Sequence, residues 1–205
     1  MNELRATRAL ISGGASGIGL AIAEALASQG VELVLVSRRL GLLEQEAARL
    51  SARYGVRVLP LALDLCDGAQ VRACHAEARE RLGPIDLLVN NSGVGSDYLV
   101  QDLPESEWDR VMDTCAKGTF LLTQACLPDM LAHRHGTIIN IASQAAKNGY
   151  ARASVYCAAK FAVLGFAKAL REEVQHQGIR VQTLCPGLVQ VPPPSCPGDR
   201  KPGWL

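Results

Sequence analysis

The chain has 205 residues, of which 48% are hydrophobic and 20% are charged, and its formal net charge is +1. A chain of this length and composition can bury one sizeable core, which excludes general disorder. The near-neutral charge lacks the basic excess typical of nucleic-acid-binding proteins, so no nucleic-acid partner is expected.

Six apolar runs alternate with helical-period segments along the chain. The runs are typical of strands buried on both faces and cover residues 8–12, 32–37, 57–63, 85–90, 137–142 and 180–185. The helical segments lie near residues 17–29, 40–53, 68–82, 105–132 and 154–177. This alternation predicts an α/β fold with a doubly wound parallel sheet of about six strands.

The two ends of the chain differ from its middle. Residues 1–8 are charged and contain no apolar run of the kind a signal peptide needs. Residues 191–205 are rich in proline and glycine and predict an irregular tail. A single folded domain is therefore expected over residues 1–190.

Neither a membrane span nor a metal site is predicted. No uninterrupted apolar stretch reaches the roughly 20 residues that cross a bilayer. The seven cysteines, at positions 66, 74, 115, 126, 157, 185 and 196, form no CxxC pair and have no metal-ligand spacing. Their odd number and apolar surroundings indicate reduced, buried thiols, and the expected location is the cytoplasm.

A glycine-rich run, Ser12-Gly13-Gly14-Ala15-Ser16-Gly17-Ile18-Gly19, joins the first strand to the first helix. Glycines there allow a tight turn, close approach of the backbone to a pyrophosphate, and close packing of helix on strand. The N-terminus of the helix points its free N–H groups and its dipole at the phosphates. The run predicts a dinucleotide site, with an ordinary turn as the alternative; the expected cofactor-binding residues are Gly13, Ser16, Gly17, Ile18 and Gly19.

The end of the second strand indicates which dinucleotide binds. An acidic residue at this place holds a ribose 2′-hydroxyl, whereas an arginine accommodates a 2′-phosphate. The sequence has Ser37-Arg38-Arg39 and no acid. NADP(H) is therefore the expected cofactor, bound by Ser37 and Arg38, although both arginines could instead be solvated charges at the start of a helix.

Two further groups follow strands at the same edge of the sheet. Asp64 and Leu65 follow the third strand, where Asp64 can reach an adenine edge. Asn91 and Gly93 follow the fourth strand, beside the expected cofactor. Helix-cap or turn residues are the alternative interpretation.

Three residues form a candidate catalytic set. Tyr156 and Lys160 are four residues apart, so a helix over 154–177 brings them to one face. The lysine ammonium is expected to lower the tyrosine pKa from about 10, so that Tyr156 can act as general acid and base. Ser143 ends the fifth strand, where its hydroxyl can hold the substrate oxygen. An ordinary core tyrosine is the alternative for Tyr156 considered alone.

Together these motifs resemble the short-chain dehydrogenase/reductase family. The resemblance covers residues from about 6 to 191 and rests on the glycine-rich run, Asn90-Asn91-Ser92-Gly93, the Ser143–Tyr156–Lys160 set and Pro186-Gly187. It implies a Rossmann-type dinucleotide-binding and catalytic domain that interconverts carbonyls and secondary alcohols with NAD(P)(H). It also implies that Pro186, Gly187 and Val189 flank the nicotinamide and that Tyr156 and Lys160 contact the cofactor.

The sequence departs from the family in three places. Cys115 stands where the family has a catalytic asparagine that helps to hold a water in the proton relay, and a thiol is a weaker donor and acceptor. Val191 stands where a threonine is common. The chain also lacks the family's last helix and strand, which suggests a truncated or shortened form and exposes a sheet edge.

These departures leave alternatives open. An NADP(H)-binding protein that is catalytically weak or inactive is the alternative to an enzyme. Among enzymes, 3-oxoacyl-carrier-protein reductases are nearest, because His133-Arg134-His135 resembles their basic loop for acyl carrier protein. Gln177 lies where those enzymes often carry another basic residue, so a small-molecule carbonyl or alcohol remains the expected substrate. The resemblance also implies a homodimer or homotetramer formed by helices 105–132 and 154–177.

Overall fold

The computed structural model describes residues 8–190. Six parallel strands form its sheet: β1 (Arg8–Ser12), β2 (Glu32–Ser37), β3 (Val58–Ala62), β4 (Leu87–Asn90), β5 (Gly136–Ile141) and β6 (Ile179–Leu184). Their order across the sheet is β3-β2-β1-β4-β5-β6, which confirms the predicted doubly wound α/β fold. Predictions for the first seven residues, for Val191 and Cys196, and for the rest of the tail lie outside the described residues.

The chain order reverses between β1 and β4, which lie side by side at the centre of the sheet. Connections from β1 and from β4 leave toward opposite sides at this point, so their carboxyl ends open a crevice. The glycine-rich run follows β1 and the Asn90–Gly93 run follows β4, so both expected binding segments meet at the crevice.

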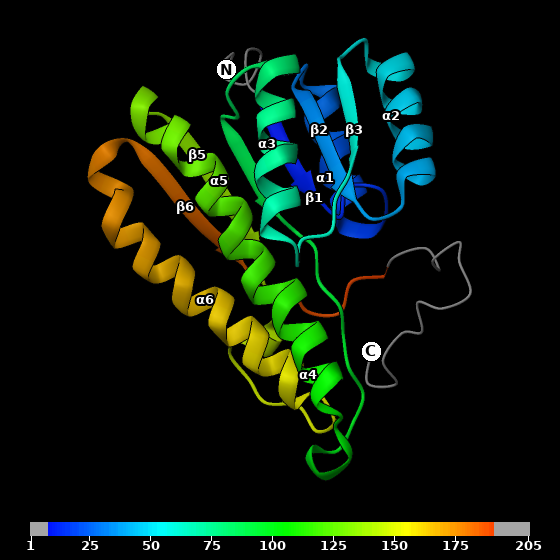
Figure 1. The fold of residues 1–205 in the computed structure, drawn as a ribbon, viewed down its shortest axis with the longest axis vertical. Helices are drawn as coiled ribbons and strands as arrows, with labels where there is room; N and C mark the ends of the chain where they lie inside the picture. Colours follow the sequence, from blue (N-terminus) through cyan, green and yellow to red (C-terminus); the bar gives the residue numbers. More distant parts are fainter. Residues whose placement is uncertain (1–7, 191–205) are drawn as a thin grey trace.

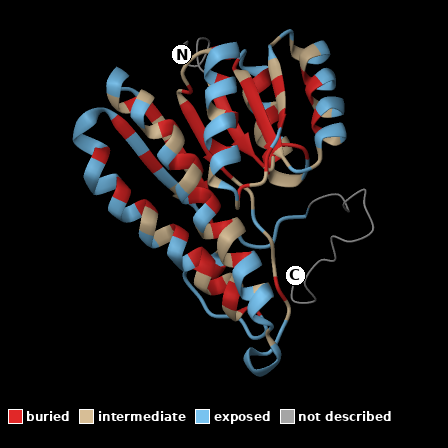
Figure 2. Cartoon of the chain, viewed as in Figure 1, coloured by how far each residue is buried: buried red, intermediate tan, exposed pale blue. Residues whose placement is uncertain are grey.

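Helices cover both faces of the sheet (Figure 1). One buried cluster lies between the sheet and α1 (Gly17–Ser28) and α2 (Leu40–Tyr54). The other lies beneath α3 (Gly68–Leu82), α5 (Gly118–His133) and α6 (Ser154–Val174). Figure 2 shows the buried residues along the strands and on the helix faces that meet them. The central strands β1, β2 and β4 are therefore buried on both faces, as the sequence predicts. The edge strand β6 differs from the prediction, because its buried residues alternate with exposed ones.

The segment predicted as one helix over 105–132 is divided into three parts. The first, α4 (Glu105–Met112), is followed by a π-helical turn, η2 (Asp113–Lys117), and then by α5. Such turns insert one residue into a helix and are frequent at functional sites. The prediction of one continuous helix over 105–132 is therefore wrong at residues 113–117.

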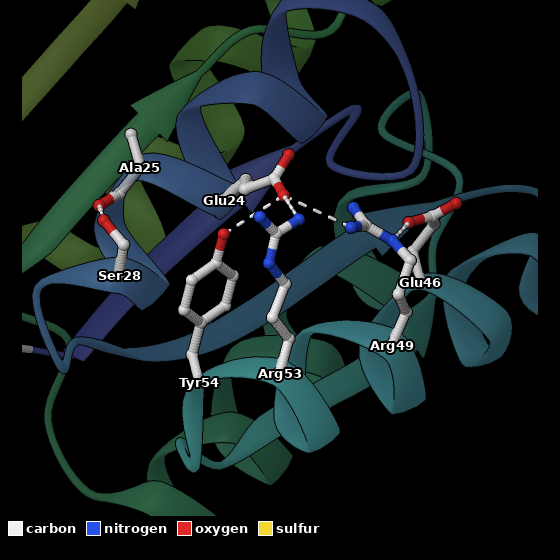
Figure 3. Close-up of polar contacts among 7 residues, drawn as sticks. All are labelled: Glu24, Ala25, Ser28, Glu46, Arg49, Arg53 and Tyr54. Carbon is white, nitrogen blue, oxygen red and sulfur yellow. Dashed lines mark hydrogen bonds and ion pairs between the residues drawn. The ribbon is translucent and has the colours of Figure 1, made fainter.

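Figure 3 shows a polar network that joins α1 to α2. The Glu24 carboxylate accepts hydrogen bonds from Arg53 Nη1 (2.7 Å), Tyr54 OH (3.1 Å) and Arg49 Nη1 (3.3 Å). Arg49 is also bound to Glu46. These contacts lower the pKa of Glu24, the hydrogen bond from Arg49 most of all. The network holds α2 against α1, and with it the β2–α2 junction that carries Arg38.

Three further properties concern the described residues alone. None of their helices combines the length and the apolarity needed to cross a membrane. Their six cysteines are free thiols. Within residues 8–190 no group of three or more His, Cys, Asp or Glu side chains could hold a metal ion.

Candidate active site

A cavity of about 750 Å³ opens at the carboxyl ends of the first four strands. The predicted residues Gly13, Ser16, Ser37 and Arg38 line one part of it, and Asp64, Leu65, Asn91 and Gly93 line another. Residues that follow β2 and β3 thus line the same cavity as residues of the crevice between β1 and β4. The remaining lining residues, which were not predicted as site residues, are Arg39, Leu63, Ser92, Val94, Gly95, Glu107, Arg110 and Thr114.

The turn between β1 and α1 requires its glycines. Gly13 and Gly17 have positive φ angles of 65° and 55°, which residues with a Cβ seldom adopt. A Cβ on Gly19 would overlap the Gly13 carbonyl oxygen and lie 2.5 Å from Asn91 Nδ2. Gly17, Ile18 and Gly19 thus shape the turn beneath the cavity, whereas Gly13 and Ser16 face it.

The segment after β4 is bonded to this turn. Ser12 Oγ accepts hydrogen bonds from the backbone N–H groups of Asn91 (2.9 Å) and Ser92 (3.0 Å). Asn91 Nδ2 donates to the Ser12 carbonyl (3.0 Å). Asn91 therefore joins two loops that are far apart in the sequence, a structural role other than the helix cap or turn of the alternative interpretation, and it also lines the cavity. Ser12 belongs to the glycine-rich run but was not predicted as a site residue, although it is the polar residue that ends the strand.

The start of α1 has the properties of an anion site. Ser16 is the N-cap, yet its side chain does not cap the helix, and the first turn contains no acidic residue. Arg39 Nη2 donates to Ser16 Oγ (3.2 Å), so a guanidinium lies beside the free N–H groups. Arg38 is exposed and also lines the cavity. The structure thus places two arginines at the site, where the sequence favoured Arg38 alone.

Asp64 combines a turn role with its place in the cavity wall. Its Oδ1 accepts from the backbone N–H of Cys66 (2.9 Å), which is an Asx-turn. Asp67, and not Asp64, caps α3, accepting from the N–H groups of Ala69 and Gln70. The carboxylate of Asp64 therefore remains at the cavity.

Ser143, Tyr156 and Lys160 come together at the carboxyl end of β5. Ser143 follows the strand and caps a short 3₁₀ helix, its Oγ accepting from Ala145 N–H (3.1 Å). Lys160 Nζ lies 5.7 Å from the centre of the Tyr156 ring, so both residues share one face of α6 as predicted. Lys160 is 4% exposed and donates to the Ile141 carbonyl (3.0 Å). Its Nζ also lies 3.3 Å from the position a Cβ on Gly93 would take, which links the set to the cavity.

The sequence predicts that the pKa of Tyr156 is lowered, and the structure shows that this prediction is wrong. Burial raises the pKa of Tyr156, and hydrogen bonding with Ser143 lowers it only in part. Burial also lowers the pKa of Lys160. Burial is the largest cause for both groups, and it favours the protonated form of the phenol.

Cys115 lies in the π-helical turn with 1% of its surface exposed. Its thiol accepts from the Val94 N–H (3.4 Å) and donates to the Val94 carbonyl (3.6 Å). It therefore satisfies both backbone groups of one residue, which an apolar side chain could not do. Thr119 Oγ1 donates to the Cys115 carbonyl (2.8 Å).

The segment after β6 carries Pro186, Gly187 and Val189. The Gln144 N–H donates to the Pro186 carbonyl (2.9 Å), which holds this segment next to Ser143. A Cβ on Gly187 would lie 3.1 Å from Gln144 Nε2. Val189 is exposed. Gln144 is thus a further polar residue of the site, and only its place directly after Ser143 could have indicated it.

Comparisons with known proteins agree with this architecture. The family model described as short chain dehydrogenase matches residues 7–193. The chain is 36% identical over 188 residues to 2-(S)-hydroxypropyl-CoM dehydrogenase 3 of Xanthobacter autotrophicus, covering 92% of this chain and 73% of the relative. It is 34% identical to the 3-oxoacyl-[acyl-carrier-protein] reductase of Escherichia coli, covering 89% and 73%.

Solved structures give the same result. L-sorbose reductase of Gluconobacter frateurii, complexed with NADPH and L-sorbose, is 35% identical with a TM-score of 0.88, covering 91% of this chain and 71% of that one. A variant of actinorhodin polyketide ketoreductase with NADPH is 35% identical with a TM-score of 0.88, covering 94% and 74%. The cofactor in both agrees with the expected NADP(H). The chain is an oxidoreductase that belongs to the short-chain dehydrogenase family.

Proposed function

We propose that the chain is an NADP(H)-dependent oxidoreductase that interconverts a carbonyl and a secondary alcohol through Ser143, Tyr156 and Lys160. The observation that carries the proposal is the meeting of these three side chains at the end of β5, with Lys160 Nζ against Gly93 of the cavity wall. A protein that only binds a dinucleotide has no need of this arrangement.

The cavity fits NADP(H). The free N–H groups at the start of α1, in a turn where a Cβ on Gly19 finds no room, would hold the pyrophosphate. Arg38 and Arg39 would hold the 2′-phosphate, with Ser37 beside them. Asp64 and Leu65 would meet the adenine, and Pro186, Gly187 and Val189 would lie by the nicotinamide. When bound, the cofactor supplies the hydride that reduces the carbonyl carbon.

The proton is handled by the protein's own groups. The Ser143 hydroxyl donates a hydrogen bond to the substrate oxygen and orients it. The Tyr156 hydroxyl, which burial keeps protonated, transfers its proton to the same oxygen as general acid. The Lys160 ammonium, one helical turn away, then stabilises the tyrosinate. Oxidation of an alcohol reverses these roles.

The substrate is proposed as a small-molecule carbonyl or alcohol. The curated relatives include reductases of carrier-bound acyl groups. Docking of acyl carrier protein would use the basic loop around Arg134, which bonds to the His176 carbonyl (3.4 Å). Gln177 weakens that option.

We further propose a homodimer or homotetramer in the cytoplasm. Large aromatic side chains remain exposed on the helices of the two segments expected at the interface, 105–132 and 154–177: Trp108 on α4, Phe120 on α5 and Phe161 on α6. The free thiols of the described cysteines suit a reducing compartment.

The competing proposal is a catalytically weak NADP(H)-binding protein, and Cys115 is the observation that favours it. Replacing Tyr156 by Phe distinguishes the two, because it removes the proton donor and retains the ring. NADPH binding is followed by fluorescence, and turnover by NADPH consumption with a panel of ketones. We expect Tyr156→Phe to bind NADPH as the unaltered chain does and to lose turnover by at least about 100-fold. Unchanged turnover would remove Tyr156 from the mechanism.

A further inference from the structure

Arg152 has a backbone conformation that is unusual for a residue with a side chain. Among residues 8–190 only Arg134 (φ 50°) and Arg152 (φ 66°) have a left-handed backbone without being glycine. Arg134 caps the end of α5, where this conformation is common. Arg152 instead lies in the loop before α6, four residues before Tyr156. Such strain persists only where surrounding contacts impose it, and it often marks a functional segment.

Two contacts hold Arg152 to the segment that follows β4. Its Nε donates to Asp97 Oδ1 (2.7 Å), and its Nη2 lies 3.4 Å from the Asp97 carbonyl oxygen. Its own carbonyl accepts from the Tyr98 N–H (3.0 Å), next to an isolated bridge between Tyr98 and Ala153. In Figure 1 this segment runs beside α4 toward the loop that precedes α6. The side chain of Arg152 thus binds Asp97, and its backbone carbonyl binds the next residue, Tyr98.

The same segment, residues 93–99, is fixed at two other points. Val94 is bound on both backbone groups by the Cys115 thiol. The Gly95 carbonyl accepts from Arg110 Nη2 (2.9 Å). Arg152 is therefore the third anchor and the one nearest in sequence to Tyr156. Ala153, which follows it, is fully buried as the N-cap of α6.

We propose that Arg152 is a positioning residue: its left-handed backbone and its ion pair with Asp97 fix the 93–99 segment against the start of α6. The segment then forms a fixed wall beside Tyr156, and the carbonyl substrate is held in one orientation. This inference rests on the proposed function for its catalytic consequence, whereas the anchoring itself can be measured without turnover.

If the strained backbone of Arg152 serves to orient the substrate, its removal should change stability and catalysis in opposite ways. Arg152→Gly removes the clash of the left-handed backbone and an exposed ion pair, which alone contributes little to stability. The midpoint of thermal unfolding is therefore expected to stay constant or to rise by about 2–4 °C. The loosened wall is expected to lower kcat/KM for a ketone by about 5- to 20-fold. A merely structural residue would lower both quantities.

The experiment measures kcat and KM at saturating NADPH for four proteins: the unaltered chain, Asp97→Asn, Arg152→Gly and the double variant. We expect both single variants to raise KM and the double variant to lose no more than Arg152→Gly, because the two residues act through one contact. Raising the ionic strength should bring the KM of the unaltered chain toward that of Asp97→Asn. Glu77→Gln, which breaks a similarly exposed 2.7 Å ion pair with Arg81 on α3, is the matched control and should change neither constant.

Hydrogen exchange of the Tyr98 amide tests the anchoring independently. Faster exchange in Asp97→Asn and Arg152→Gly is expected, and unchanged exchange would overturn the proposal. Faster exchange with unaltered kcat and KM would also overturn it, because the segment would then orient nothing. If the unaltered chain reduces no ketone, the proposed function fails and the catalytic consequence fails with it, while the exchange result still decides whether Arg152 anchors the segment.

Discussion

Replacing Gly19 by alanine tests the cofactor turn at its most crowded point. The added Cβ would overlap the Gly13 carbonyl oxygen and lie 2.5 Å from Asn91 Nδ2, closer than real Cβ atoms come to other heavy atoms. Both neighbours are fixed, since Gly13 N–H donates to Val36 (2.8 Å) and Asn91 Nδ2 donates to Ser12 (3.0 Å). The backbone of the turn must therefore move.

The cost of Gly19→Ala follows from these contacts. Overpacking costs about 1–3 kcal/mol, and loss of the Asn91 hydrogen bond costs about 1 kcal/mol more. The sum is about 2–4 kcal/mol, which for a chain of this size lowers the unfolding midpoint by about 4–16 °C. Because the displaced backbone faces the pyrophosphate, NADPH affinity should fall at least about tenfold.

The assay combines thermal unfolding with a fluorescence titration of NADPH. Gly41→Ala is the control, since Gly41 is helical and a Cβ there meets nothing within 4 Å. That variant should gain up to about 1 kcal/mol and bind NADPH normally. The reasoning is refuted if Gly19→Ala unfolds within about 1 °C of the unaltered chain and retains its affinity.

Three other predictions follow from the site and its supports. Arg38→Ala and Arg39→Ala should each weaken NADPH by about 10- to 100-fold and leave NADH unchanged in a competitive titration; equal losses for both cofactors would contradict a 2′-phosphate role. Cys115→Val deletes both bonds to Val94, so calorimetry should show a loss of about 1–2 kcal/mol while Cys115→Ser remains near the unaltered chain; no difference between the two would show that the thiol bonds are unimportant. Folding lowers the Glu24 pKa below its ordinary 4.5, so the ionised Glu24 stabilises the fold above that pH, and this stabilisation is lost as the pH falls through the pKa of the folded state. In denaturant titrations the free energy of unfolding of Glu24→Gln should therefore fall less on acidification than that of the unaltered chain. An identical fall in both proteins would contradict the role of the network.

The sequence was sufficient for the sheet because its strands are mostly apolar runs that are separated by segments of helical period. All six strands lie within two residues of their predicted positions, and so do the first three helices. The last helix, α6, ends three residues earlier than predicted, and the predicted helix over 105–132 is divided into three parts. The π-helical turn around Cys115 was not predicted, because it is defined by its backbone hydrogen bonds and no residue type in Asp113–Lys117 marks it. The bond between Cys115 and Val94 was not predicted either, since it joins residues 21 positions apart in the sequence.

The candidate site was predictable where spacing along one element sets the geometry. Tyr156 and Lys160 lie on one face of α6 because four residues make about one helical turn. Gly13 and Gly17 were predicted correctly because the turn needs residues with positive φ angles. The second arginine at the phosphate end was not selected. Its contact with Ser16 depends on how α2 packs against α1, which local patterns do not specify. The direction of the Tyr156 pKa depends on burial in the same way.

Hydride transfer is the central claim, and isotope transfer tests it most directly. The chain is incubated with NADPH deuterated at the transferring position and a ketone that it consumes, and the alcohol is analysed by mass spectrometry. The account predicts one deuterium on the carbinol carbon, with product formation lost in Tyr156→Phe and NADPH binding retained. Failure to form a deuterated alcohol from any ketone of the panel, despite tight NADPH binding, would contradict it and favour a binding protein.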